Sequence, residues 1–378
     1  MDSYLIKNGT LFSILDGSER QADILVENGI VTRIDENIDT PADETYNAQG
    51  MFVSVGWLEA HCHFLRPNGT ISLNPVDDLL RQGVTYALDL GTVGPDDYAA
   101  CSQAVRAASD LRFRTYLNIA HAGMYPPGKS VDFEGPEDIV PELVAKTVEK
   151  YRPELMGLKA RIDDRFCFDP VYVMDQMRVL ADQLQMPIAV HAPRSRIGIE
   201  KLLCYMKAGD VLCHTLAGNS EAMSILDKDG QIKPCVLEAR ERGVVFDLSH
   251  GTNAYSYDTA EAAWKAGFFT DTVSSDLHGR NINGPVYNPG VVYAKVRGLT
   301  GKPWWWILNK AVAEPVRLLN VHDKAVEIRE GMQADLTVFR IDEGVFNYLD
   351  SKKESREFSE KATAVFTCFG SHVYTCRS

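Results

Sequence analysis

The chain has 378 residues, of which 45% are hydrophobic and 24% are charged, a composition that is typical of a globular protein. Its formal net charge is -13, from 39 basic and 52 acidic side chains, which argues against a nucleic-acid-binding protein because such a protein would present a basic face. No stretch approaches about 18 uncharged apolar residues, and the first residues lack the basic and apolar segments of a signal peptide, so we predict neither a membrane span nor a secretion signal.

Both ends of the chain consist of short strand patterns separated by turn residues. These patterns occupy residues 4–14, 22–35, 44–56, 326–342 and 361–376. The pairs Asn8-Gly9 and Asn28-Gly29 stand between β-like runs, where an Asn-Gly pair is typical of a two-residue hairpin turn. We therefore predict a small composite β-sandwich domain that residues 1–55 and 325–378 form together.

The middle of the chain alternates between short apolar runs and helical patterns. The apolar runs occupy residues 51–60, 84–91, 113–120, 155–161, 186–192, 210–216, 243–251 and 271–279. The helical patterns between them include residues 96–110, 141–151, 169–185 and 258–267. Continuous apolar runs are typical of parallel strands that helices cover. Eight such units predict an α/β fold, a (β/α)8 TIM barrel over residues 56–324. A doubly wound open sheet is the alternative, but "GTVGPDD" is a poor match to the Gly-rich phosphate loop that it would need.

Two histidines, His61 and His63, stand one residue apart at the end of the first barrel run. Side chains alternate between the faces of a strand, so residues i and i+2 point the same way. The two imidazoles could therefore serve one metal ion. The pair alone is weak evidence, because two unrelated histidines would give the same pattern.

Polar residues also end four later strands of the predicted barrel. Lys159 ends the fourth strand, His191 the fifth, His214 the sixth and Asp276 the eighth. Barrel enzymes carry their chemistry at the C-terminal ends of the strands, so these side chains should converge with the histidine pair on one mouth. Imidazole and carboxylate ligands suit Zn²⁺, Mn²⁺ or Fe²⁺. The sequence therefore predicts a divalent-metal site.

At these residues the sequence resembles the amidohydrolase superfamily of metal-dependent hydrolases. The resemblance rests on "VGWLEAHCH" at the first barrel strand and on "IREGMQADLTVF" near the end, and it covers nearly the whole chain. The segments "GVTYALDLG", "AVHAP", "VLCHTLAG" and "VSSDLHGRNINGPVY" are similar to those of the amidohydrolase/deacetylase, or dihydroorotase-like, subgroup. Val55 stands where proline is common in the superfamily, a departure in a backbone turn and not in a ligand.

The resemblance implies a binuclear metal site. Six residues would hold two divalent ions, which we expect to be Zn²⁺: His61, His63, Lys159, His191, His214 and Asp276. The histidine pair would hold one ion together with Asp276, and the other two histidines would hold the second ion. Lys159 would carry a CO2-derived carbamate that bridges the ions. A hydroxide between the ions would attack the substrate, with Asp276 as the catalytic proton shuttle.

Five further residues are candidates for contacts with substrate. Arg66, Arg161 and Arg194 are candidate clamps for a carboxylate. Dihydroorotases place an arginine just after their histidine pair, and in this chain Arg66 stands one residue further on. His250 and His278 end the seventh and eighth strands, where they could orient substrate or stabilise a developing oxyanion. The alternative is that these two histidines only support neighbouring side chains or pack against them.

These features predict a metal-dependent hydrolase that attacks an amide or ester carbonyl, such as a deacetylase or another acyl hydrolase of a small carboxylate substrate. A close alternative is a cyclic amide hydrolase of the dihydroorotase or hydantoinase type. A mononuclear deaminase is a weaker alternative, because it would not need Lys159 as a ligand. An alternative of another class is a non-catalytic assembly scaffold, which should have lost some ligands, whereas all six positions are filled here.

The remaining expectations concern location and partners. The 8 cysteines are scattered without a C-x-x-C spacing, which is typical of reduced cysteines in a cytoplasmic protein. We expect a small-molecule substrate and neither a nucleic-acid nor a membrane partner. A helix cannot turn Trp304, Trp305 and Trp306 toward the same core, so at least one of these side chains should be exposed or lie in an interface. The sequence is therefore compatible with a homo-oligomer.

Overall fold

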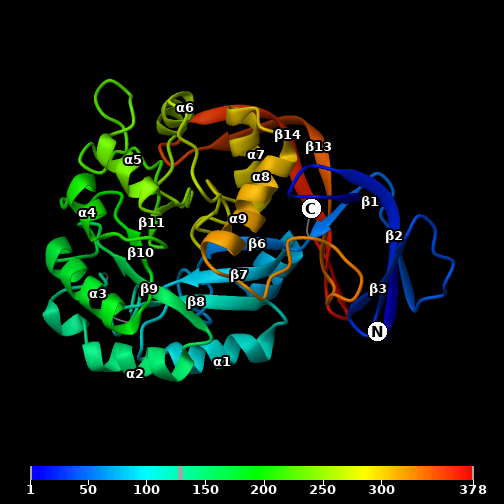
Figure 1. The fold of residues 1–378 in the computed structure, drawn as a ribbon, viewed down its shortest axis with the longest axis horizontal. Coiled ribbons are helices and arrows are strands. Elements are labelled where there is room, and N and C mark those ends of the chain that lie inside the picture. Colours follow the sequence, from blue (N-terminus) through cyan, green and yellow to red (C-terminus); the bar gives the residue numbers. More distant parts are fainter. Residues whose placement is uncertain (1, 127–130, 377–378) are drawn as a thin grey trace.

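The computed structural model describes residues 2–126 and 131–376, whose strands form two sheets (Figure 1). One is a seven-stranded parallel sheet with helices around it, and the other is an eight-stranded sheet in which both ends of the chain meet. The predicted α/β class is confirmed.

The parallel sheet follows the order of the chain. Its strands are β6 (Trp57–Cys62), β7 (Val84–Leu90), β8 (Arg112–Asn118), β9 (Leu155–Arg161), β10 (Ile188–His191), β11 (Val211–Cys213) and β12 (Val245–Phe246). Every residue of β6 and β7 is buried, which is why their sequences are apolar without alternation. Because the strands are parallel, their C-terminal ends share one edge of the sheet.

Helices follow the strands as the sequence predicts. They are η1 (Pro75–Leu79), η2 (Leu80–Gln82), α1 (Tyr98–Ala108), η3 (Pro136–Asp138), α2 (Pro141–Tyr151), α3 (Pro170–Leu184), α4 (Ile199–Tyr205), α5 (Pro234–Glu241), α6 (Tyr257–Lys265), α7 (Pro289–Thr300), α8 (Trp304–Leu308), η4 (Asn309–Ala313) and α9 (Glu314–Leu318). Helix α3 shows the local cause. Asp169 caps it by accepting hydrogen bonds from the backbone N–H groups of Val171 and Tyr172, and Pro170 opens its first turn.

The eighth predicted barrel strand is not a regular strand. It makes two single parallel bridges, one between Thr272 and Asp247 and one between Leu277 and Cys62 of β6. The segment therefore contacts both edges of the parallel sheet. Asp276, between these bridges, has a φ of 49°, which interrupts the extended conformation.

The second sheet joins the two ends of the chain. Its strands are β1 (Ser3–Phe12), β2 (Glu19–Glu27), β3 (Ile30–Asp35), β4 (Glu44–Asn47), β5 (Phe52–Val55), β13 (Asp335–Leu349), β14 (Ser355–Phe369) and β15 (His372–Thr375). Strand β5 pairs with β1 on one side and with β13 on the other. These pairings continue one hydrogen-bonded ladder through both ends of the chain, so the described strands form one sheet where the sequence predicted a sandwich.

The two Asn-Gly pairs have different roles. Asn28-Gly29 joins β2 to β3 as a hairpin turn, with φ values of 52° and 76°, which confirms that prediction. Asn8-Gly9 lies inside β1, where Asn8 has a φ of 61° and the register against β2 shifts between Ile6 and Gly9. The predicted turn there is wrong, because the left-handed backbone that suits a hairpin turn also suits a β-bulge.

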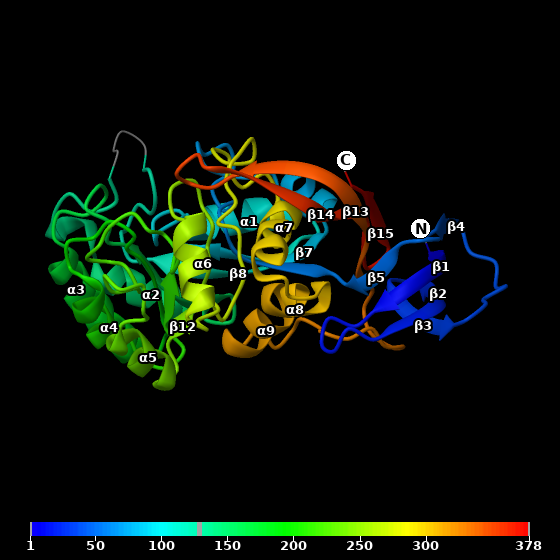
Figure 2. The same cartoon turned by 90° about the horizontal axis from the view of Figure 1, so that it is seen from above.

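Strands β13 and β14 extend beyond the terminal sheet and lie across the helices of the other layer (Figure 2). At the end of β13, Asp350 accepts a hydrogen bond of 3.1 Å from the backbone N–H of Tyr257 in α6. The buried Lys295 of α7 donates one of 2.7 Å to the carbonyl oxygen of Leu349. The C-terminal segment therefore packs on the helices around the parallel sheet as well as on the N-terminal strands.

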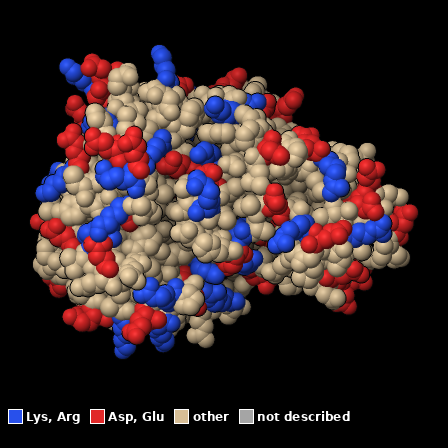
Figure 3. All heavy atoms as spheres, in the orientation of Figure 1, with Lys and Arg blue, Asp and Glu red and all other residues tan. Residues whose placement is uncertain are grey.

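Lys and Arg side chains are interspersed with Asp and Glu on the face seen in Figure 3, and neither sign dominates it. Within the described ranges, no helix combines the length and the apolar character needed to cross a membrane.

Candidate metal centre

The six predicted metal ligands stand at or near the C-terminal ends of the parallel strands. Strand β6 carries His61 with His63 just after it, β9 carries Lys159, β10 ends at His191, β11 is followed by His214, and the eighth segment carries Asp276. All of these side chains are buried except that of His191, which is 14% exposed. Burying so many polar groups is unfavourable unless they bind one another or a metal.

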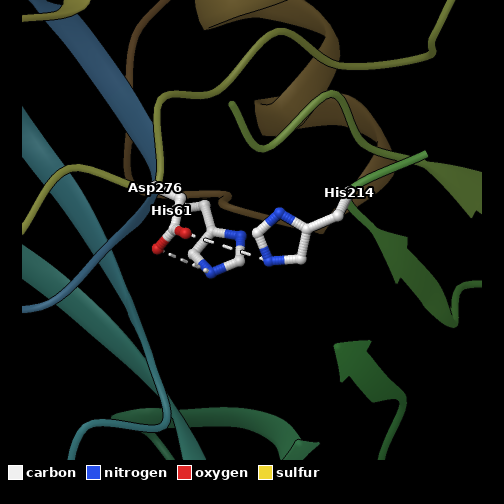
Figure 4. Close-up of side chains that lie close together, drawn as sticks. All are labelled: His61, His214 and Asp276. Atoms are coloured by element: carbon white, nitrogen blue, oxygen red, sulfur yellow. Dashed lines mark ion pairs between the residues drawn. The ribbon is translucent and has the colours of Figure 1, made fainter. Parts of the chain in front are cut away.

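Figure 4 shows His61, His214 and Asp276 pointing toward one another from three separate elements. One potential ligand atom from each lies within 4.8 Å of the others. The Nε2 atom of His63 lies 3.0 Å from Oδ1 of Asp276. The rings of His191 and His214 have their centroids 4.4 Å apart. The structure therefore brings five of the six residues into one cluster.

Hydrogen bonds to the other ring nitrogen orient three of the histidines. Nδ1 of His61 lies 3.0 Å from Oγ of Ser249, and Nδ1 of His63 lies 2.9 Å from Oγ1 of Thr92. Nδ1 of His214 lies 2.6 Å from the carbonyl oxygen of Ser249. A carbonyl can only accept, and each hydroxyl donates its own proton to an aspartate, so Nδ1 carries the proton in each ring. The Nε2 atoms keep their lone pairs for a ligand.

The Nε2 atoms also test whether a metal fits the cluster. Those of His191 and His214 are buried and have no hydrogen-bond partner among the described residues. A buried acceptor without a partner is costly in a folded protein, whereas an imidazole lone pair aimed at a cation is a normal metal ligand. Neutral imidazoles beside the carboxylate of Asp276 form a donor set suited to Zn²⁺ and similar ions. The residues present therefore fit a divalent metal.

Burial keeps the histidines in the neutral form that a metal needs. It lowers the pKa of His63 to about 3 and that of His214 to about 4. The pKa values of His61 and His191 are also lowered well below the usual value, chiefly by burial and further by the positive charge of neighbouring groups. Because a protonated imidazole cannot bind a cation, this environment favours metal binding at neutral pH.

Lys159 is 1% exposed, and its Nζ lies 3.1 Å from Sγ of Cys213. Its amine makes no ion pair with any described acidic residue. Gly91 leaves room for its alkyl chain, because a Cβ atom at that position would lie 2.5 Å from Cγ of Lys159. The amine is thus held next to the histidine cluster, and no carboxylate of the described residues lies within ion-pair distance of it.

A cavity of about 130 Å³ opens beside the cluster. His63, His191, His214 and Asp276 border it on one side. Aromatic and arginine side chains border it on the other, among them Tyr125, Phe166 and Arg161. The cluster is therefore accessible to a small molecule.

Two of the predicted substrate contacts, Arg161 and His278, border this cavity. Arg161 is 3% exposed and donates to Asp132 through Nε at 2.7 Å and through Nη2 at 2.6 Å. Nε2 of His278 lies 3.2 Å from the hydroxyl of Thr252. The structure brings both predicted residues to the mouth of the site.

Arg66 and His250 do not border the cavity. Arg66 donates hydrogen bonds of 2.6 Å to the carbonyl oxygens of Ala122 and Met124, so its guanidinium is used within the protein. His250 is fully buried, and its Nε2 accepts a hydrogen bond of 2.8 Å from Lys295. Nothing in this placement supports a substrate contact by either residue.

Sequence reasoning missed the side chains that orient the histidines. Asp89 accepts a hydrogen bond of 2.7 Å from Thr92, and Asp247 accepts one from Ser249. Asp89 stands in "ALDLG" and Asp247 in "VVFDLSHG", so each is a charged residue inside an apolar strand. That unusual placement is a signal that could have identified both residues.

The chain is similar to known hydrolases over its whole length, although no family model matches it. A deacetylase of Enterococcus faecalis is 27% identical over 377 residues, which cover 98% of each chain. A solved structure described as an adenine deaminase is 26% identical, with a TM-score of 0.87, and the match covers 98% of this chain and 99% of that one.

The chain belongs to the amidohydrolase superfamily. It is a hydrolase, as the other members that it matches are. A dihydroorotase structure that is 22% identical shares the fold of this amidohydrolase, with a TM-score of 0.89 over 100% of this chain and 98% of the other.

Proposed function

We propose that this amidohydrolase cleaves an amide or ester bond of a small acylated carboxylate, as a deacetylase or a related acyl hydrolase. The observation that carries the proposal is the cluster of His61, His214 and Asp276 beside a cavity. The buried Nε2 atoms of His191 and His214, which have no hydrogen-bond partner among the described residues, add to it. The name of the deacetylase relative supports the same class of reaction.

The cluster would hold two divalent ions, with zinc as the expected metal. One ion would bind the histidine pair of β6 together with Asp276, and the second would bind His191 and His214. Lys159 would react with CO2 to give a carbamate, which supplies the anionic oxygens that a second cation requires. The burial of its amine without an acidic partner supports this assignment.

When bound, the ions would acidify a water molecule and polarise the acyl carbonyl. Asp276 would accept a proton from the attacking water and deliver it to the leaving nitrogen or oxygen. Its Oδ1 lies 3.0 Å from Nε2 of His63 and 3.6 Å from Nε2 of His61, and it borders the cavity. His278 stands on the same wall and would orient the substrate.

The proposed chemistry needs all six candidate ligands at one end of a closed barrel. We infer that residues 56–324 act as one barrel, in which the eighth segment completes the ring, and that residues 1–55 and 325–378 act as one composite β domain. The bridges of Thr272 and Leu277 to both edges of the parallel sheet support the first inference. The pairing of β5 with β13 supports the second.

A second candidate is hydrolysis of a cyclic amide. The observation that favours it is the fold match to a dihydroorotase, which covers the whole chain.

The test is metal analysis combined with a substrate screen. Purified protein should contain about two divalent ions per chain, and it should hydrolyse some acylated amino or hydroxy acids. One ion or none after incubation with Zn²⁺ and bicarbonate would contradict the binuclear site. Hydrolysis of dihydroorotate or hydantoin in place of the acyclic compounds would favour the second candidate. Two bound ions without hydrolysis of any of these compounds would contradict the proposed substrate class.

A further inference from the structure

Three arginines border the cavity beside the metal cluster: Arg161, Arg165 and Arg280. Two of them have a carboxylate partner. Arg161 forms a two-point hydrogen bond with Asp132, and Arg165 forms one with Asp163, at 2.7 and 3.0 Å. The positive charges of these two residues are therefore compensated inside the protein.

Arg280 is different, because its guanidinium makes no ion pair or hydrogen bond with any described side chain. Its guanidinium carbon lies 4.6 Å from the centre of the Tyr125 ring. Stacking on a ring holds a guanidinium while leaving its N–H groups free along the edge, where they match a carboxylate in two-point geometry. Arg280 thus supplies the uncompensated positive charge of this cavity.

The backbone around Arg280 is tied to the proposed catalytic residue. The N–H of Arg280 donates to Nδ1 of His278 at 3.2 Å, and the N–H of His278 donates to Oδ1 of Asn281 at 2.9 Å. Nδ2 of Asn281 donates to the carbonyl oxygen of Asp276 at 2.8 Å. These bonds fix the segment from Asp276 to Asn281, so the base of the Arg280 side chain has a defined position relative to the cluster.

We propose that Arg280, stacked on Tyr125, binds the carboxylate of the substrate and sets the specificity of the enzyme for acylated acids. This inference rests on the proposed hydrolase function. The carboxylate would bind at Arg280 while the acyl carbonyl lies at the metal cluster. One uncompensated arginine matches one negative charge, which favours a monocarboxylate over a phosphate dianion. The substrate class is therefore a small amino or hydroxy acid acylated on its nitrogen or oxygen.

The experiment compares each acid with its primary amide. N-acetylalanine and O-acetyllactate, in both enantiomers, are tested beside the corresponding amides, which lack only the carboxylate charge. The proteins are wild type, Arg280→Gln and the control Arg196→Gln, because Arg196 is also exposed but pairs with Asp164 away from the cavity. We measure kcat and KM, and we measure binding of free lactate and lactamide by calorimetry.

We expect wild type to prefer the acid, and Arg280→Gln to lose that preference by on the order of 10- to 100-fold in kcat/KM, mainly through KM. Arg196→Gln should behave as wild type. Equal use of acid and amide by wild type, or an unchanged preference in Arg280→Gln, would overturn the proposal. If no compound is hydrolysed, the proposed function is wrong, and the role of Arg280 is then tested by calorimetry alone. Tighter binding of lactate than of lactamide that Arg280→Gln abolishes would support Arg280, and equal or absent binding would overturn its role.

Discussion

Three residues at the metal cluster hold backbone conformations that most side chains avoid. His214, Ser249 and Asp276 have φ values of 62°, 43° and 49°. Such left-handed positions cost on the order of 1–3 kcal/mol each and persist where the surrounding structure holds them. His214 and Ser249 lie after the ends of β11 and β12, Asp276 lies in the eighth segment, and each turns a side chain or a carbonyl oxygen toward the cluster. The strain therefore coincides with the positions that the proposed chemistry uses.

Asp276→Asn tests the proton transfer at this residue. Asparagine keeps the shape of the side chain but cannot carry the proton, and general acid–base catalysis contributes on the order of 10²–10⁴-fold. We expect kcat to fall by at least about a hundredfold while much of the metal remains bound. The measurement is kcat with metal content, beside the control Asp258→Asn, whose carboxylate is 69% exposed on α6. A nearly normal kcat with full metal occupancy would exclude Asp276 as the shuttle.

Thr92→Val tests the hydrogen bond that orients His63. Valine has the same shape as threonine but cannot accept the proton of Nδ1, so the ring loses its fixed orientation. Loss of such a supporting hydrogen bond typically lowers metal affinity by about 10- to 100-fold. Competition with a chelator measures the affinity, and Thr45→Val on the exposed strand β4 is the control. Equal affinity in both variants would show that Thr92 does not support the ligand.

The clustering of the candidate ligands was predictable from the sequence, whereas the hydroxyl groups that orient them were not. His61 and His214 end apolar runs, and a polar residue at that position in a barrel points toward its mouth. The hydroxyl groups of Thr92 and Ser249 carry no such signal, because threonine and serine are common in loops. The placement of Arg280 depends on a turn whose course follows from hydrogen bonds to His278 and Asn281. The spacing of these residues in the sequence does not indicate that these hydrogen bonds form.

Among the elements, the long hairpin of β13 and β14 has the most unexpected position. The sequence pattern predicted strands at this end of the chain, but it did not predict that they reach across the helices around the parallel sheet. The reason lies at the turn, where Asp350 is 1% exposed and accepts from the N–H groups of Tyr257, Lys352 and Glu354. One buried carboxylate therefore joins the hairpin to α6.

Asp350→Ala tests this connection. The substitution removes the acceptor of three N–H groups, and each buried donor left without a partner costs about 1–3 kcal/mol. We expect the free energy of unfolding to fall by roughly that amount or more, with faster proteolysis near the turn. Asp342→Ala, on the same strand with its carboxylate 23% exposed, should change it by less than about 1 kcal/mol. Equal effects of the two variants would contradict a special role for Asp350.

Other elements show where a local pattern reaches its limit. Helices such as α2 and α3 were predictable because their apolar spacing and opening prolines are local to the element, and α3 also has its cap at Asp169. The eighth barrel strand was predicted as regular, but Asp276 interrupts it. The left-handed backbone of Asp276 turns its carboxylate toward the cluster and is incompatible with an extended strand. Asn8-Gly9 forms a bulge and not a turn, because β1 stays paired with β2 on both sides of it.

For the whole molecule, the cluster places an unusual number of titratable groups in the interior. Burial lowers the pKa of His63 to about 3 and the pKa values of His214 and His278 to about 4. It also lowers the pKa values of His61, His191 and His250 well below the usual value. These six histidines remain neutral in the folded protein at a pH at which they would be protonated in the unfolded chain.

This difference predicts that the metal-free protein loses stability as the pH falls. A histidine whose pKa is lowered on folding stabilises the fold above the unfolded pKa of about 6.5, and that contribution is lost as the pH falls toward the folded value. Each such group contributes at most about 1.4 kcal/mol per pH unit. Glu59 acts in the opposite direction, because burial raises its pKa to about 8. Asp210 and Asp247, whose pKa values burial also raises, do the same. Six histidines against three carboxylates should still leave a net loss of stability between about pH 6.5 and pH 4.

Urea unfolding of chelator-treated protein between about pH 7 and pH 5 measures this loss. Proton uptake on unfolding should be lower by as much as about one proton in His278→Asn, because that histidine is neutral in the fold and protonated in the unfolded chain. Bound metal should raise the free energy of unfolding throughout, and most at neutral pH, because it binds only the neutral imidazoles of the folded state. The neutral state of the histidines in the folded protein would be contradicted if the free energy of unfolding did not change with pH and His278→Asn also left the proton uptake on unfolding unaltered.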